Sequence, residues 1–102
     1  MEEFTEQVIN IIQNIPSGKV STYGTIARMA GSPRGARQVV RILHSMTAKY
    51  GLPWHRVINS KGQIAFNEIE AKENKAILLS KEGIEISENH RINLTKYLWD
   101  GE

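Results

Sequence analysis

The first stretch of the chain has apolar residues at the three- and four-residue spacing of one helix face. These residues are Phe4, Val8, Ile11, Ile12 and Ile15. Acidic side chains in the first turn favour a helix N-terminus, and Glu2, Glu3 and Glu6 lie there. Pro16-Ser17-Gly18 follows and is typical of a helix end. The pattern therefore predicts an amphipathic helix that ends before residue 16.

Two further helices are predicted, joined by a glycine turn. Ser21 or Thr22 can cap a short helix that runs to about residue 30, with Gly31 as its left-handed terminator. Ser32 and Pro33 are typical of an N-cap and the first position of a third helix, which runs to about residue 46. Two helices joined in this way form a helix-turn-helix.

The predicted third helix has two different faces. Its apolar stripe consists of Ala36, Val39, Val40, Leu43 and Met46. Arg34, Arg37 and Arg41 are spaced three and four apart, so they project together on another face. Gly35 and Ala36 are small and would let a backbone approach closely. This arrangement suits a helix that lies against a phosphate backbone.

The rest of the chain predicts a β-hairpin, a helix and a docked tail. Residues 47–53 read as a loop, and residues 56–58 and 63–66 as two strands joined by a turn at residues 60–62. A helix over about residues 70–82 ends at Gly83, and residues 85–93 look loosely held. Apolar tail residues are expected to dock onto the core: Leu94, Tyr97, Leu98 and Trp99. The fold class expected for residues 1–102 is one mostly α domain with a small β-hairpin.

Composition narrows the functional classes. The chain has 102 residues, 40% of them hydrophobic, and no cysteine, which excludes disulfides and thiolate metal sites. No apolar run approaches membrane-spanning length, and the acidic start does not look like a secretory signal. Neither His44 nor His90 has a partner at metal-ligand spacing, so neither a metal nor a cofactor is predicted. We expect a cytoplasmic, nucleoid-associated location, or a nuclear one in a eukaryote.

The charges are strongly polarised along the chain. Residues 7–67 contain eight basic residues and no acidic residue, whereas residues 68–102 contain five basic and eight acidic residues. An acid-free half presents a positive surface, which suits a polyanion such as nucleic acid. A solvated basic face without a partner is the alternative.

The segment Pro53-Trp54-His55-Arg56-Val57 resembles the Pro-Cys-His-Arg-Val motif of the O6-alkylguanine-DNA alkyltransferases. Three more segments match that family in the right order. They are residues 15–23 (Pro-x-Gly-x-Val-x-x-Tyr), 36–39 (Ala-Arg-x-Val) and 78–83 (Leu-Leu-x-x-Glu-Gly). The family's nucleophilic cysteine is replaced by Trp54, whose indole cannot accept an alkyl group as a thiolate can. The chain thus resembles the non-catalytic alkyltransferase-like proteins.

The resemblance implies a winged-helix-like helix-turn-helix, as in the alkyltransferase C-terminal domain, and roles for two residues. Arg37 matches the arginine that enters the duplex through the minor groove in place of the extruded nucleotide. Its planar guanidinium can stack on bases, although a phosphate contact or a solvated side chain is the alternative. Tyr23 matches the tyrosine that crowds the phosphate of the target nucleotide. The alternative is a half-buried tyrosine packed on the third helix.

The motif around Trp54 implies a lesion pocket without catalysis. Trp54 would form its wall and contact the flipped base, or else be a core residue that seals it. In the enzymes a glutamate orients the histidine that matches His55, and counting places that glutamate at Ala76. We therefore expect His55 to be a structural hydrogen-bonding residue with no orienting carboxylate. Arg56 is expected to tie the loop to backbone carbonyls, with a phosphate contact as the alternative.

The predicted partner is duplex DNA that contains O6-alkylguanine. The resemblance implies that the base is flipped, that no alkyl group is transferred, and that nucleotide-excision-repair proteins respond. We expect a monomer. Residues 65–68 replace the enzymes' Gly-rich loop, so a different lid and a more open pocket are expected. Two rivals remain: an enzyme in which His55 activates water, and a sequence-specific helix-turn-helix regulator that reads the major groove.

Overall fold

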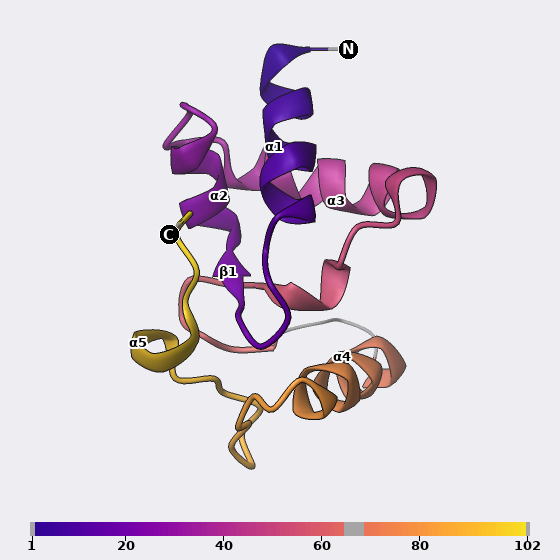
Figure 1. The fold of residues 1–102 in the computed structure, drawn as a ribbon, viewed down its shortest axis with the longest axis vertical. Helices are drawn as coiled ribbons and strands as arrows, with labels where there is room; N and C mark the ends of the chain where they lie inside the picture. The colour runs from indigo at the N-terminus through magenta and orange to yellow at the C-terminus, as the bar shows by residue number, and fades with distance from the viewer. Residues whose placement is uncertain (1, 65–68, 102) are drawn as a thin grey trace.

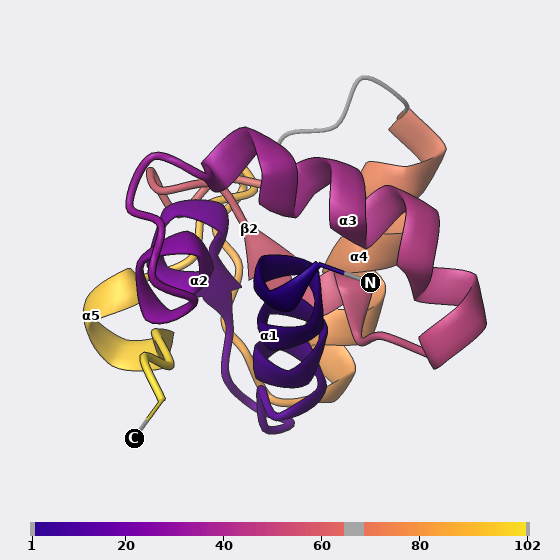
Figure 2. The same ribbon diagram turned by 90° about the horizontal axis from the view of Figure 1, so that it is seen from above.

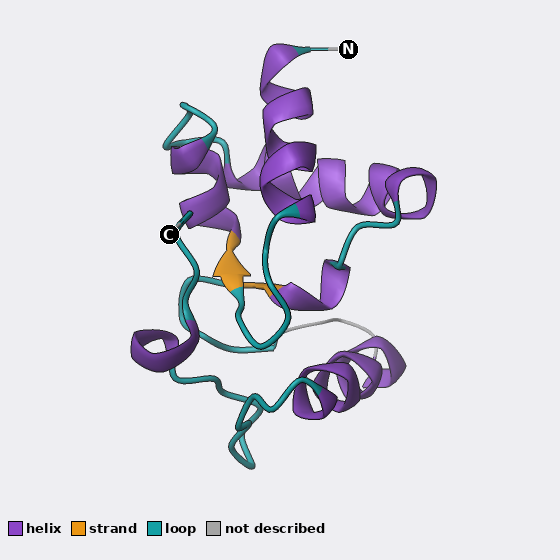
Figure 3. Ribbon diagram, in the orientation of Figure 1, coloured by secondary structure: helices purple, strands orange, loops and turns teal. Residues whose placement is uncertain are grey.

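The structure is a computed structural model that describes residues 2–64 and 69–101. Figures 1 and 3 show a mostly helical chain with two short strands at its centre. In chain order the elements are α1 (Glu3–Gln13), β1 (Ser21–Thr22), α2 (Tyr23–Met29), α3 (Ala36–Tyr50), the 3-10 turn η1 (Trp54–Arg56), β2 (Val57–Ile58), α4 (Ile69–Lys81) and α5 (Leu94–Tyr97). The predicted mostly α class with a small β element is confirmed, but the two strands do not form the predicted hairpin.

Two apolar clusters form the interior, one on each side of the strand pair. The first joins α1, α2 and α3, whose buried residues include Val8, Ile26 and Val39. The second joins α4, α5 and the connecting segments around Leu79 and Tyr97. Figure 2, viewed from above, shows α1 and α2 side by side with α3 running across them. The strands therefore connect a three-helix unit to a smaller C-terminal layer.

The two strands pair differently from the predicted hairpin. β1 and β2 are parallel, with Ser21 opposite Val57 and Thr22 opposite Ile58. The side chain of Asn59 accepts hydrogen bonds from the backbone N–H groups of Lys61 and Gln63, which turns the chain away from β2. Residues 62–64 then bond to residues 90–92 instead. Residues 65 and 66 of the predicted second strand lie outside the described residues.

The third helix begins later and ends later than predicted. Ser32 and Pro33 belong to a turn that the Gly35 N–H closes on the Ser32 carbonyl at 2.9 Å. The helix starts at Ala36 and continues to Tyr50, where Gly51 adopts a left-handed conformation with φ of 60°. A Cβ at Gly35 would lie 2.9 Å from the Phe4 ring, so this glycine lets the turn pack on α1. Its small size is thus required for internal packing.

The caps of α2 and the docking of the tail match expectation, but residues 85–93 are not loosely held. The Thr22 hydroxyl accepts the Thr25 N–H, and Gly31 has φ of 89°. Tyr97 is buried, and the Trp99 N–H donates to the Val20 carbonyl at 2.7 Å. Antiparallel bridges from Gln63 to Arg91 and from Ile86 to Ile92 hold the connection. Although most of residues 85–93 are polar, Ile86 and Ile92 pack in the second apolar cluster and anchor this segment.

Candidate nucleic-acid interface

The outer face of α3 carries exposed basic side chains. Arg37 and Arg41 are exposed and lie one helical turn apart, and His44 continues the same face. Val39, Ile42 and Leu43 are buried against the rest of the molecule. Arg34 is exposed too, but it lies in the turn before α3 because the helix begins only at Ala36. The predicted basic face is therefore made by two helical arginines and one from the preceding turn.

Basic groups are also exposed elsewhere in the acid-free part of the chain. Those on the surface are Arg28, Arg34, Arg37, Arg41, Lys49 and Lys61. Among the side chains that the structure describes, those of residues 2–64 and 73–101, Arg37 and Arg41 form no ion pair. Their charges are thus available to an external anion, as the sequence pattern predicts.

Beside this face lies a pocket of about 240 Å³, lined by Tyr23, Leu43, His44, Thr47 and Trp54. Tyr23 is the first residue of α2, and burial raises the pKa of its phenol. The structure thus brings Tyr23 and Trp54 into one pocket, although the two residues lie 31 positions apart in the sequence. Sequence analysis gave His44 and Thr47 no role. The seven-residue spacing from Arg37 to His44, about two helical turns, was the available signal for His44.

Trp54 separates this pocket from a second hollow. Its backbone N–H donates to the Leu52 carbonyl at 2.8 Å, which starts the tight turn η1. The second hollow, of about 520 Å³, is lined by Trp54 together with Gln13, Gly51, Leu52, Pro53, His55, Arg56 and Leu78. The His55 ring meets the indole edge to face, with centroids 6.1 Å apart. Trp54 is therefore a shared, half-buried wall and not a fully enclosed core residue.

His55 does have an orienting carboxylate, contrary to the sequence prediction. Its Nε2 lies 2.7 Å from Oε2 of Glu82, whereas Ala76, the predicted position, packs on the second apolar cluster. Glu82 directly follows α4, and Gly83 with φ of 88° turns the chain there. The sequence did contain a signal for this contact, because Glu82 is the glutamate of the Leu-Leu-x-x-Glu-Gly segment at residues 78–83. Counting residues along the helix selected the wrong position.

Arg56 binds the same carboxylate and ties it to the first helix. Its Nη2 lies 2.8 Å from Glu82 Oε2, and its Nη1 donates to the Ile15 carbonyl at 3.0 Å. The Gly18 N–H also donates to Glu82. Burial alone would raise the pKa of Glu82, but hydrogen bonds from Arg56, His55 and Gly18 outweigh it and lower the pKa to about 2. The expected backbone-carbonyl role of Arg56 is confirmed, and the carboxylate is an addition.

Lys75 was not singled out by the sequence analysis. It lies in α4, is 1% exposed, and donates a hydrogen bond to the Val57 carbonyl. Its Nζ lies 5.9 Å from the centroid of the Trp54 ring, and burial lowers its pKa to about 7. The four-residue spacing from Lys75 to buried Leu79 was the one sequence sign that it faces inward.

The described part of the chain contains no cluster of three His, Asp or Glu side chains able to hold a metal ion. Among its helices, none combines the length and apolar character needed to cross a bilayer.

Comparison with known proteins places this geometry in a family. The model of the 6-O-methylguanine DNA methyltransferase DNA-binding domain matches residues 3–84. A DNA base-flipping protein of Vibrio parahaemolyticus is 46% identical over 101 residues, covering 97% of this chain and 98% of the relative. Alkyltransferase-like protein 1 of Schizosaccharomyces pombe is 42% identical over 104 residues, covering 97% and 96%.

Solved structures agree with these matches. The crystal structure of S. pombe Atl1 in complex with damaged DNA containing O6-carboxymethylguanine has a TM-score of 0.85 and 40% identity, covering 97% of this chain and 96% of that one. Mycobacterium tuberculosis O6-methylguanine methyltransferase has a TM-score of 0.63 and 26% identity, covering 93% of this chain and 55% of that one.

The chain therefore belongs to the family of the 6-O-methylguanine DNA methyltransferase DNA-binding domain. Within that family it is an alkyltransferase-like member, with Trp54 in the place of the nucleophilic cysteine. A methyltransferase of Methanosarcina acetivorans is only 33% identical over 81 residues. The chain has no cysteine, and its more similar relatives are named a DNA base-flipping protein and an alkyltransferase-like protein, so the protein is not an alkyl-transferring enzyme.

Proposed function

We propose that this protein binds duplex DNA at O6-alkylguanine, rotates the damaged base out of the helix and holds it without removing the alkyl group. The observation that carries the proposal is the position of the Tyr23–Trp54 pocket beside the exposed arginines of α3. The likeness to S. pombe Atl1, solved with damaged DNA containing O6-carboxymethylguanine, supports it.

The size and lining of the pocket suit one flat base. At about 240 Å³ it is smaller than the roughly 300–1,000 Å³ of sites for drug-sized ligands. The indole of Trp54 offers an aromatic surface, and stacking on such a surface contributes about 1–3 kcal/mol per base. Extrusion costs a few kcal/mol, and least for a base whose pairing is already weakened. Selectivity for the lesion then arises from the stacking on Trp54 and from the lower cost of extruding a weakly paired base.

The exposed side chains of α3 carry out the rotation in this proposal. Arg37 enters the stack through the minor groove and fills the space that the base leaves. Arg34 and Arg41 bind phosphates on either side, and Tyr23 at the start of α2 presses on the phosphate of the target nucleotide. The Tyr23 phenol carries no charge near neutral pH, and burial raises its pKa further, so it does not repel that phosphate.

Because the chain has no cysteine thiolate, no alkyl transfer follows the binding of the base. Trp54 presents an N–H donor and a ring where the family's enzymes have their nucleophile. His55, Arg56 and Glu82 remain, and here they fix the loop that carries Trp54. The held lesion would then be recognised by nucleotide-excision-repair proteins. A monomer acting in the cytoplasm on the nucleoid, or in a nucleus, completes the proposal.

Binding to two matched duplexes tests it, one with O6-methylguanine and one with guanine in the same sequence. We expect tighter binding to the modified duplex. A methyl-labelled lesion run in parallel should leave all label in the DNA. Label on the protein, or methanol or free O6-methylguanine in solution, would instead establish an enzyme. A preference for one undamaged sequence over the lesion would establish a regulator.

A further inference from the structure

Lys75 places a charged side chain in the interior of the C-terminal layer. It is 1% exposed and stands among the largest fully buried side chains, with Leu79 one helical turn further along α4. Lysine is almost never fully buried without a specific partner, because its ammonium loses hydration. An apolar residue would fill this position at lower cost to the fold. The position therefore points to a task beyond packing.

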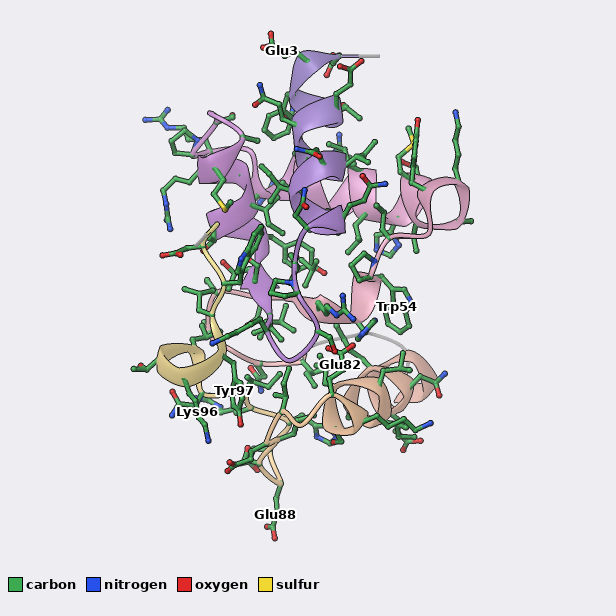
Figure 4. The ribbon with its side chains drawn as sticks, in the orientation of Figure 1. Glu3, Trp54, Glu82, Glu88, Lys96 and Tyr97 are labelled. Carbon is green, nitrogen blue, oxygen red and sulfur yellow. The ribbon has the colours of Figure 1, made fainter. Side chains whose placement is uncertain are left out.

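Two contacts of Lys75 are with the segment that carries the pocket wall. The ammonium donates to the carbonyl of Val57, which directly follows η1. The same nitrogen lies 5.9 Å from the Trp54 ring centroid, within the range of a cation–π contact. Figure 4 shows Trp54 between the two helices that Figure 1 labels α3, above it, and α4, below it. Lys75 thus reaches Trp54 from α4, whereas Leu43, His44 and Thr47 line the pocket from α3.

We propose that Lys75 is a positioning residue for base binding: its ammonium, fixed by the Val57 carbonyl, holds the Trp54 indole as the wall of the pocket. The inference rests on the proposed function for its consequence in DNA binding. A ring held in its binding orientation before the base arrives loses less conformational freedom on binding. Because the ring is also the surface on which the base would stack, its orientation affects the lesion more than the phosphate contacts made by α3.

The first test compares K75M, which removes the charge at similar length, with L79A, which weakens the packing of α4 in the second apolar cluster, whereas Trp54 packs on the first. At pH 6, affinities are measured for the O6-methylguanine duplex and for its unmodified match. K75M should reduce the ratio of the two affinities by about 2- to 30-fold, the range that a cation–π contact of roughly 0.5–2 kcal/mol implies. L79A should leave the ratio unchanged. An unchanged ratio in K75M, or an equal loss in L79A, overturns the proposal.

The second test needs no DNA, so it separates this proposal from the proposed function. The chain has two tryptophans, and W99F leaves Trp54 as the only source of indole fluorescence. Adding K75M should shift the Trp54 emission and weaken its near-UV circular dichroism, whereas adding L79A should not. K75Q, uncharged but able to donate a hydrogen bond, replaces K75M if the latter shows no cooperative unfolding. Emission that is the same with and without the charge overturns the proposal, even if lesion binding is confirmed.

Discussion

The arginines of α3 and Arg56 are the same residue type used in opposite ways. Arg37 and Arg41 are exposed and make no ion pair within the described parts of the chain. Arg56 is half-buried and directs its guanidinium to Glu82 and to the Ile15 carbonyl. The exposed charges suit a polyanion that arrives from outside. The buried one joins the loop, α4 and the end of α1 into a single unit.

The comparison distinguishes residues that hold the Trp54 loop in place from residues that would react with or bind a ligand. In the enzymes that the chain resembles, the histidine and glutamate serve a cysteine. Here the cysteine is replaced by Trp54, yet His55 and Glu82 still lie 2.7 Å apart. Retention of the pair without the nucleophile indicates that Glu82 holds the loop in place. The predictions below test the buried network first and the exposed face afterwards.

Removal of the Glu82 carboxylate should have the largest effect on the fold. E82A leaves the Arg56 guanidinium half-buried without its carboxylate and removes the acceptor of the Gly18 N–H. Breaking such a pair costs about 3 kcal/mol of unfolding free energy. Urea denaturation followed by circular dichroism measures it.

Glu85 provides the matched control, because it pairs with Lys96 at 2.9 Å while the two side chains are 80% and 58% exposed. An exposed pair contributes little to stability, because water screens the two charges. E85A should therefore unfold at nearly the same urea concentration as the parent protein. Equal losses in E82A and E85A would show that the internal network does not stabilise the loop.

Acid should destabilise the protein through the same carboxylate. The pKa of Glu82 is about 2 in the folded chain against an ordinary value of 4.5, so the folded state favours the charged form. The stabilisation is fully present above pH 4.5 and is lost as the pH falls towards 2. E82Q cannot titrate at this position and should show a flatter loss of stability over that range. If the unfolding free energies of the parent protein and E82Q fell in parallel between pH 4.5 and 2, Glu82 would not be the group responsible.

Substitution of Arg37 tests the exposed face. R37A should weaken binding to the O6-methylguanine duplex by about 1–3 kcal/mol and binding to the unmodified duplex by less, because only the flipped state leaves a gap for the side chain. R28A is the control, since Arg28 is also an exposed arginine but lies in the last turn of α2 and not on α3. Equal weakening of both duplexes by R37A would indicate a phosphate contact instead.

Restoring the nucleophile should produce the smallest effect. With Glu82 bonded to Nε2 of His55, the other ring nitrogen can accept a proton from a thiol at position 54. We therefore expect slow transfer of a labelled methyl group from O6-methylguanine DNA to the W54C protein. The double variant with W54C and E82Q should transfer more slowly still. Complete inactivity of folded W54C would show that more than the cysteine is missing.

Features set by local pattern were predictable from the sequence. The apolar stripe of the first helix, the Thr22 cap and the exposed arginines follow from residue spacing alone. The Pro53–Arg56 motif correctly indicated that Trp54 would line a pocket. That pocket also depends on α2 and α3, and the helix-turn-helix pattern had already placed those two helices side by side.

Features set by distant contacts were not predictable. Ser32 and Pro33 carry an N-cap signal, yet packing of Gly35 on Phe4 delays the helix to Ala36. Turn bonds at Asn59 send residues 62–64 to residues 90–92, which no alternation of residue types specifies. The contact between Glu82 and His55 is different, because the matched segment 78–83 contains the glutamate and only the count along the helix selected Ala76. Lys75 is buried by contacts that its polar neighbours in the sequence do not reveal.

The most direct test of the central claim is the fluorescence of 2-aminopurine placed beside the lesion in a duplex, because this base brightens when its neighbour leaves the stack. The protein should raise the fluorescence of the O6-methylguanine duplex, and R37A should raise it less at saturating concentration. The unmodified duplex should show little change. Equal affinity for both duplexes, with no rise in fluorescence on the damaged one, would contradict the account.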